Sequence, residues 1–138
     1  MKIMGIDYGD SRVGIAISDS LGITAQGLET IHHKGNDKIV LKRLEEIIND
    51  NDINTIVIGM PYKLNGDSAD RVDITKNFIH KLKCKFNKIK IVEVDERLTT
   101  VAAHRTMNEL GIKNKNKKNI VDTISAVYIL EMYMNSKK

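Results

Sequence analysis

The stretch Ile3-Met4-Gly5-Ile6-Asp7-Tyr8-Gly9 is followed at once by Asp10-Ser11-Arg12-Val13-Gly14-Ile15-Ala16-Ile17. Two apolar runs flank turn-forming residues, a pattern that predicts a β-hairpin. An acid, Asp7, stands at the end of the first run, among residues that should be buried. Burying a polar group costs about 2–7 kcal/mol unless partners offset the loss of water. Asp7 is therefore either a metal ligand or phosphate-handling acid, or a turn acid whose carboxylate accepts backbone N–H groups. This stretch alone leaves both open.

The bulk composition predicts one globular domain over residues 1–138. The chain is 41% hydrophobic and 29% charged, which is ordinary for a globular protein. No apolar run approaches the roughly 20 residues that span a bilayer, and the N-terminus lacks a signal-peptide pattern. The single cysteine, Cys84, excludes an internal disulfide and a cysteine metal cluster. We expect a cytoplasmic protein.

The net charge of +4 and pI of about 9.1 are compatible with a polyanionic partner, but a solvated surface explains them equally well. Aromatic residues make up only 4% of the chain, with no tryptophan. This composition argues against a stacking platform for single-stranded bases, which needs several exposed rings.

Apolar periodicity beyond the hairpin predicts alternating strands and helices. The expected elements are a short strand over 27–33, a helix over 37–51, a buried strand over 54–60, a helix over about 68–83, a strand over 88–94, a helix from Thr99 or Thr100 to Gly111, a lysine-rich loop over 112–118 and a helix over about 119–134. The order βββαβαβαα predicts an α/β fold with a mixed five-stranded sheet and helices on both faces. Chemistry in such sheets gathers beyond the carboxyl ends of the parallel strands.

Acidic residues stand where strands or helices are expected to meet. Asp7 ends the first strand, Asp95 and Glu96 end the last, and Asp122 falls in the first turn of the final helix. Convergent carboxylates are the ligands that Mg²⁺ or Mn²⁺ selects, and a metal pair can hydrolyse a phosphodiester without a nucleophilic side chain. Each acid also has a structural explanation: Asp122 would complement a helix dipole, and the other pair could be a solvated strand end.

The remaining polar residues give weaker signals. Four lysines crowd residues 113–118, and they would either neutralise phosphate at the rim of the site or form a solvated loop. The four histidines have no recognisable metal-ligand spacing. Ser11 and Ser125 lack a nearby histidine and acid in the sequence, which makes serine hydrolysis improbable.

Four motifs in order resemble one family. DYGxxRVGIA at the start, VIGMP followed by NGD, VDERLTT, and KKNIVDTISAV are similar to the YqgF family, whose members are described as pre-16S ribosomal RNA nucleases and as Holliday junction resolvases. The likeness spans almost the whole chain. It implies a ribonuclease H-like fold and a cytoplasmic enzyme that processes ribosomal RNA precursors. One departure is Asn65-Gly66, where the family usually has Asp-Gly, and it puts only a loop contact in doubt.

The resemblance also implies the site. Asp7, Glu96 and Asp122 correspond to the acidic, metal-binding residues of the ribonuclease H-like site, and Asp95 could assist. Arg12 and Arg97 stand at the family's arginines, where they would orient phosphate or brace the acids. To these the lysine-rich loop adds Lys115, Lys117 and Lys118 as candidate nucleic-acid contacts.

Three functions from different classes remain open. The first is a Mg²⁺- or Mn²⁺-dependent endonuclease that acts on structured precursor ribosomal RNA as a monomer or homodimer and leaves 5′-phosphate and 3′-hydroxyl ends; a variant of it resolves four-way DNA junctions. The second is a nucleotide-binding domain, because GIDYG also resembles the phosphate-binding hairpin of actin-like sugar kinases, although those need two such domains. The third is a non-catalytic RNA-binding module in ribosome assembly or transcription.

Overall fold

The computed structural model describes residues 2–9, 11–61, 69–95 and 114–136, with side chains for all of these except 69–70 and 114–122. The elements are β1 (Lys2–Tyr8), β2 (Arg12–Ser18), β3 (Ala25–His32), α1 (Asp37–Asn51), β4 (Ile53–Met60), α2 (Ala69–Lys85), β5 (Lys90–Asp95) and α4 (Asn114–Ser136). Their order confirms the predicted one, with small shifts at the boundaries. The helix predicted between Thr99 or Thr100 and Gly111 lies outside the described residues.

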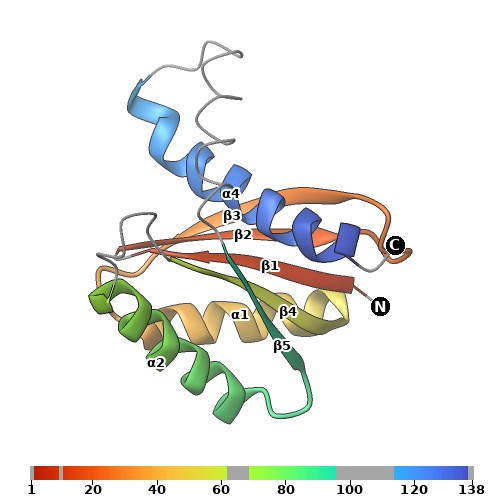
Figure 1. The fold of residues 1–138 in the computed structure, drawn as a ribbon, viewed down its shortest axis with the longest axis horizontal. Helices are drawn as coiled ribbons and strands as arrows, with labels where there is room; N and C mark the ends of the chain where they lie inside the picture. Colours follow the sequence, from red (N-terminus) through yellow and green to blue (C-terminus); the bar gives the residue numbers. More distant parts are fainter. Residues whose placement is uncertain (1, 10, 62–68, 96–113, 137–138) are drawn as a thin grey trace.

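The sheet is mixed and five-stranded, as predicted, with the order β3-β2-β1-β4-β5 (Figure 1). Strand β1 is central, antiparallel to β2 and parallel to β4, while β5 continues the parallel part beyond β4. Because β1, β4 and β5 are parallel, their carboxyl ends lie at one edge of the sheet. This edge is where ligands bind in open α/β sheets.

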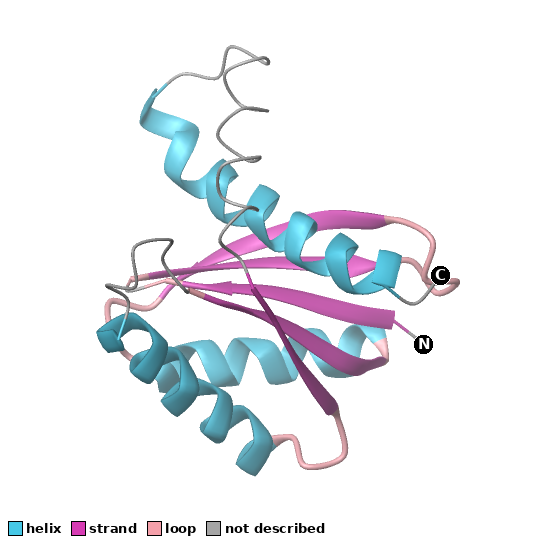
Figure 2. Ribbon diagram, viewed as in Figure 1, coloured by secondary structure: helices cyan, strands magenta, loops and turns pink. Residues whose placement is uncertain are grey.

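Helices cover both faces of the sheet, α1 and α2 on one side and α4 on the other (Figure 2). Strand residues alternate between the two faces, so each side has its own core. The core beneath α1 and α2 contains Met4 and Ile6 of β1, both fully buried. The core beneath α4 contains Ala16 and Val57 of the sheet with Ala126 of the helix.

Helix α1 has the predicted bounds, because local signals agree with its packing. The side chain of Asn36 caps the helix by accepting a hydrogen bond from the backbone N–H of Lys38. Its buried residues, Val40, Leu44 and Ile47, recur at the three- and four-residue spacing of one helix face.

Helix α4 begins at Asn114, so the predicted loop over 112–118 is wrong from residue 114 onward. The run contains neither glycine nor proline after Gly111, and lysine is a good helix former whose charge stays in water at a helix surface. As a consequence Asp122 lies well inside the helix instead of in its first turn, where the macrodipole acts most strongly. The dipole explanation of this acid therefore fails.

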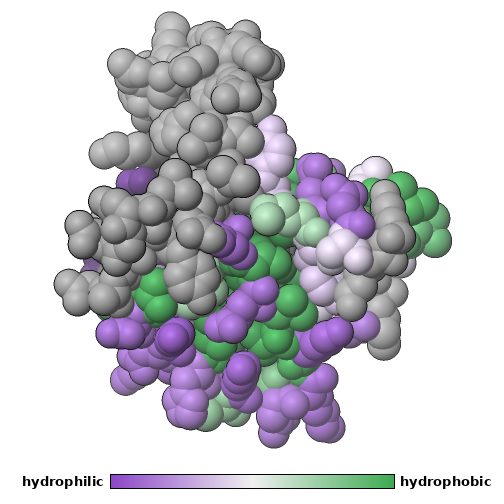
Figure 3. All heavy atoms as spheres, in the orientation of Figure 1, coloured by the Kyte–Doolittle hydropathy of each residue, from purple (hydrophilic) through white to green (hydrophobic). Residues whose placement is uncertain are grey.

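The visible surface over α2 is mostly hydrophilic (Figure 3). Its charged residues include Lys81, which pairs with Asp37 of α1 at 2.9 Å, and Lys85, which pairs with Glu45 at 3.4 Å. No helix within the described ranges is both long and apolar enough to cross a membrane.

Candidate functional site

Asp7 lies one residue before the carboxyl end of the central strand. Strand alternation places Met4, Ile6 and Tyr8 on the face of α1 and α2, where all three belong to the core. The intervening positions, Gly5 and Asp7, therefore belong to the face of α4. Asp7 is half-buried there, at the sheet edge where the predicted site should be.

Glycines stand on both sides of Asp7. On β2 its register partner is Gly14. On β4 the pairing of Ile6 with Ile58 brings the next residue, Gly59, beside Asp7. Neither neighbour has a side chain, and a glycine within a strand often marks the close approach of a ligand. At the two neighbouring strand positions, therefore, no side chain stands beside Asp7.

Helix α4 packs unusually close to β1. A Cβ atom at Gly5 would lie 2.7 Å from the carbonyl oxygen of Ala126 and 2.8 Å from the Cβ of Leu130. The other end of the helix, with Glu131 and Met134, borders a cavity of about 290 Å³ next to Ala25, at the start of β3. Helix α4 therefore runs antiparallel to β1. The turn of α4 that precedes Ala126 lies toward the carboxyl end of β1, where Asp7 stands.

Asp122 belongs to that preceding turn. It lies four residues before Ala126, which places its backbone on the same face of the helix. The structure thus brings the backbone positions of Asp7 and Asp122 to one side of the sheet. The side chain of Asp122 lies outside the described set, as do those of Lys115, Lys117 and Lys118 on the same helix.

Strand register fixes the face on which Asp95 lies. Asp95 pairs with Met60, which is 1% exposed in the core beneath α1 and α2. Asp95 therefore shares the face opposite to Asp7. The preceding Val94 packs in the core beneath α4, as the alternation of strand residues requires. Glu96 itself, like Arg97, lies outside the described residues.

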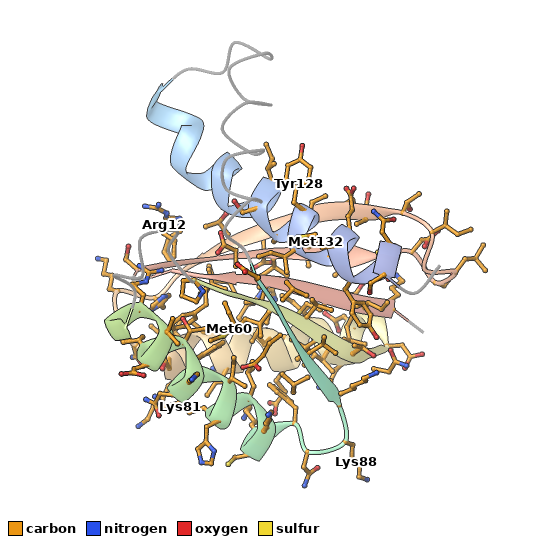
Figure 4. The ribbon with its side chains drawn as sticks, viewed as in Figure 1. Arg12, Met60, Lys81, Lys88, Tyr128 and Met132 are labelled. Atoms are coloured by element: carbon orange, nitrogen blue, oxygen red, sulfur yellow. The ribbon has the colours of Figure 1, made fainter. Side chains whose placement is uncertain are left out.

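Two arginines lie near the carboxyl end of β1. Arg12 begins β2, two residues before Gly14, and its side chain rises on the α4 side of the sheet (Figure 4). Arg71 comes from α2 and donates a hydrogen bond from Nη2 to the carbonyl oxygen of Tyr8 at 3.4 Å. Sequence reasoning identified Arg12 and missed Arg71, because the α2 residue reaches β1 only through the fold.

A buried histidine fixes the turn that follows Asp7. His33, 1% exposed, accepts a hydrogen bond at Nδ1 from the N–H of Gly35, and its Nε2 lies 3.0 Å from the carbonyl oxygen of Gly9. Because Nδ1 is an acceptor, these contacts fit the neutral ring that carries its proton on Nε2. Both ring nitrogens are thus occupied by the backbone. This histidine is structural, in agreement with the absence of a metal-ligand spacing.

Tyr8 anchors the end of β1 from the side opposite to Asp7. Its ring stacks on Phe78 with centroids 4.2 Å apart and on His33 at 5.7 Å. Its hydroxyl donates to Asp37 Oδ1 at 2.6 Å, and Lys81 donates to the second oxygen of that carboxylate at 2.9 Å. These contacts hold the strand in place without occupying the face that carries Asp7.

Whether a divalent cation fits this place depends on the available donors. No three His, Cys, Asp or Glu side chains gather in the part of the chain that the structure describes. Of the three predicted acidic ligands, that part includes the side chain of Asp7 alone. Two observations are compatible with a hard cation: the carboxylate of Asp7 between two glycines, and the fully buried hydroxyl of Ser125, for which the described part of the chain shows no hydrogen-bond partner. A buried polar group of this kind calls for an explanation, and a bound ion or water is one.

Comparison with known proteins gives a consistent relationship. The family model described as "RuvX: Holliday junction resolvase" matches residues 1–136. A relative from Ruminiclostridium cellulolyticum, called "Putative pre-16S rRNA nuclease", is 55% identical over 135 residues, which cover 98% of this chain and 94% of the relative. A protein of the same name from Acetivibrio thermocellus is 49% identical and covers 99% of this chain and 97% of its own length.

Solved structures confirm the ribonuclease H-like fold expected from the motifs. The RuvC of T. thermophilus in complex with a Holliday junction substrate aligns with 99% of this chain and 96% of its own, with a TM-score of 0.62 and 14% identity. The Fowlpox virus resolvase, also solved with Holliday junction DNA, covers 99% of both chains with a TM-score of 0.58 and 12% identity. At these identities the likeness concerns the fold alone.

Proposed function

The chain belongs to the RuvX family of Holliday junction resolvases, and from this membership we propose that it is a metal-dependent nuclease that processes the 5′ end of precursor 16S ribosomal RNA. The observation that carries the proposal is the position of Asp7. Its carboxylate lies at the carboxyl edge of the central strand, between Gly14 and Gly59, on the face that α4 covers. The names of the most similar relatives supply the substrate class.

In the proposed site, the carboxylates of Asp7, Glu96 and Asp122 hold Mg²⁺ or Mn²⁺. Oxygen ligands are what these ions prefer. The strand register, which turns Asp95 toward the opposite face, supports Glu96 as the acid from the end of β5. A bound metal pair supplies an activated water nucleophile and neutralises the charge on the leaving oxygen. The products are then a 5′-phosphate and a 3′-hydroxyl.

In this proposal, arginine and lysine side chains bind the phosphate backbone of the nucleic acid. Arg12 lies on the same face of the sheet as Asp7, two residues before Gly14 on β2. Arg97 follows Glu96 directly, and Lys115, Lys117 and Lys118 belong to the helix that covers this face. Charges so placed position a polyanion without reading its sequence, which suits recognition of RNA by its shape.

The test is cleavage of precursor 16S ribosomal RNA by the wild type and by Asp7→Asn, each with and without Mn²⁺ or Mg²⁺. Asp73→Asn is a matched control, since Asp73 is an exposed acid of α2, the helix that covers the opposite face of the sheet. We expect Asp7→Asn to lose metal-dependent cleavage while its circular dichroism and melting temperature stay close to those of the wild type. The control should cleave normally. Undiminished cleavage by a folded Asp7→Asn protein would refute the proposal.

A four-way DNA junction is the second candidate substrate. The description of the family as Holliday junction resolvases favours it, and the junction should therefore be assayed in parallel. Symmetric cutting of two strands needs two active sites, so a strictly monomeric active form would count against this alternative. If Asp7→Asn instead supports growth as well as the wild type in cells that depend on the protein, a non-catalytic RNA-binding role replaces both.

A further inference from the structure

Ser125 is a buried polar residue that the fold itself does not satisfy. It is 0% exposed, and its Oγ is the one buried side-chain oxygen of the described residues without a hydrogen-bond partner. A serine inside a helix commonly donates to the carbonyl four residues earlier or points to solvent. Ser125 does neither. A hydroxyl that stays buried without a partner destabilises the protein, so its presence calls for a ligand that is bound in the working state.

The helix geometry places this hydroxyl next to the candidate site. Thr123 marks the flank of α4 above β3, because a Cβ at Gly27 would lie 3.2 Å from the Cβ of Thr123. Residues two apart point about 200° away from each other on an α-helix, so Ser125 lies on the flank that faces β1 and β4. Its level on the helix is one residue before Ala126, whose carbonyl crowds Gly5. Ser125 thus lies on the flank of α4 toward β1 and β4, and the antiparallel course of α4 places it toward the end of β1 that holds Asp7.

We propose that Ser125 is a positioning residue of the metal site: its hydroxyl makes the missing hydrogen bond to a water ligand of the divalent cation that Asp7 binds. The inference rests on the proposed function. Mg²⁺ and Mn²⁺ keep several waters when proteins bind them through few carboxylates. A serine hydroxyl can donate one hydrogen bond and accept two. Hydrogen bonds in the shell around the ligands commonly change metal affinity by about 10–100-fold.

Ser18 provides a matched control within the same chain. It is 1% exposed, and it lies under the opposite end of α4. Its hydroxyl accepts from the N–H of Ile3 at 2.8 Å and donates to the carbonyl of Asp19 at 3.0 Å. The hydroxyl of Ser18 therefore makes its hydrogen bonds within the protein, whereas the described residues provide no such partner for the hydroxyl of Ser125.

The experiment compares Ser125→Ala with Ser18→Ala by thermal unfolding without metal and during titration with Mn²⁺ alone. Without metal, we expect Ser125→Ala to melt at the same temperature as the wild type or up to about 4 °C higher, because an unsatisfied group has been removed. Ser18→Ala should melt at a lower temperature. The Mn²⁺ concentration that gives half of the stabilisation should rise about tenfold in Ser125→Ala and stay unchanged in Ser18→Ala.

Two results would overturn the inference. One is a Mn²⁺ titration of Ser125→Ala that coincides with the wild type, and the other is a loss of metal-free stability as large as that of Ser18→Ala, which would reveal an internal partner for the hydroxyl. The Asp7→Asn variant distinguishes failure of the Ser125 inference from failure of the proposed metal site. If Asp7→Asn loses the Mn²⁺ response while Ser125→Ala keeps it, the metal site stands and only the role of Ser125 falls. A wild type that neither responds to Mn²⁺ nor cleaves RNA would refute both proposals.

Discussion

Gly5→Ala tests the contact that sets the distance between α4 and the central strand. The added Cβ would lie 2.7 Å from the backbone oxygen of Ala126 and 2.8 Å from the Cβ of Leu130, and ordinary contact begins at 3.4 Å. Neither atom is the end of a flexible side chain. The helix must therefore move away from β1 by about 0.7 Å, or the strand must sink by as much, and overpacking of this kind costs about 1–3 kcal/mol.

The same displacement should also affect the proposed catalysis. Helix α4 carries Asp122 and Ser125, so its movement changes their distance from Asp7. Misplacement of catalytic groups by about 1 Å can lower a rate by a factor on the order of 100. We expect the free energy of unfolding, measured in urea, to fall by about 1–3 kcal/mol, and cleavage per folded molecule to fall at least tenfold, about 1.4 kcal/mol in the barrier.

Gly27→Ala is the graded control for this prediction. A Cβ at Gly27 meets Thr123 Cβ at 3.2 Å, so the neighbour must yield by only a few tenths of an ångström. Its loss of stability should be smaller than that of Gly5→Ala, and cleavage should be nearly normal. A Gly5→Ala protein that is as stable and as active as the wild type would show that the close approach of α4 to β1 does not position the site.

Three further predictions follow from single contacts. Tyr8→Phe should lower the free energy of unfolding in urea by about 1.5–3 kcal/mol, because the hydroxyl donates to the carboxylate of Asp37 at 2.6 Å; an unchanged denaturation midpoint would contradict this. Arg12→Gln should weaken RNA binding and reduce the slope of log affinity against log salt by about 1, whereas an unaltered slope would exclude a phosphate contact. The backbone N–H of Ile23 lowers the pKa of Asp19, so Asp19 is ionised at a lower pH in the folded state than in the unfolded one. The stability that it contributes is then present above the unfolded pKa of about 3.9 and disappears as the pH falls through the folded pKa. Asp19→Ala should accordingly be less stable than the wild type at neutral pH and equal to it in acid, which thermal unfolding over a pH series can measure.

Local sequence predicted most of the fold because strand and helix signals agreed with tertiary packing. Helix α1 shows this most clearly, since its cap at Asn36 and its buried face follow directly from residue type and spacing. The predicted start of the last helix, at about residue 119, is wrong because local signals are weak there. Its first residues are polar and lack an apolar face, and only the absence of glycine and proline after Gly111 hinted that the helix extends to Asn114.

The candidate site was less accessible from sequence because it depends on register. The sequence places Asp95 at the end of a strand without showing which face it occupies, and only its pairing with Met60 assigns it to the face opposite to Asp7. Arg71 belongs to none of the four motifs, and Ser125 stands within KKNIVDTISAV without any sign of a role. The first reaches Tyr8 across the edge of the sheet, and the significance of the second lies in a missing hydrogen bond, which no sequence pattern reveals.

The two faces of β1 have different roles: one carries Asp7, and the other packs the strand against the core through Tyr8. Asp7 and Tyr8 are adjacent in sequence and point to opposite sides of the sheet. The face of Tyr8 is closed by Phe78, His33 and Asp37, so these contacts fix the strand end from the face opposite to Asp7. A carboxylate on such a strand is held in place before an ion or substrate arrives, and preorganisation of this kind is what electrostatic catalysis demands. Loosening the anchor should therefore weaken Mn²⁺ binding at Asp7 even though every proposed ligand is intact. Tyr8→Phe, titrated with Mn²⁺ beside the wild type, would expose this coupling, and an unchanged titration would mean that the two faces act independently.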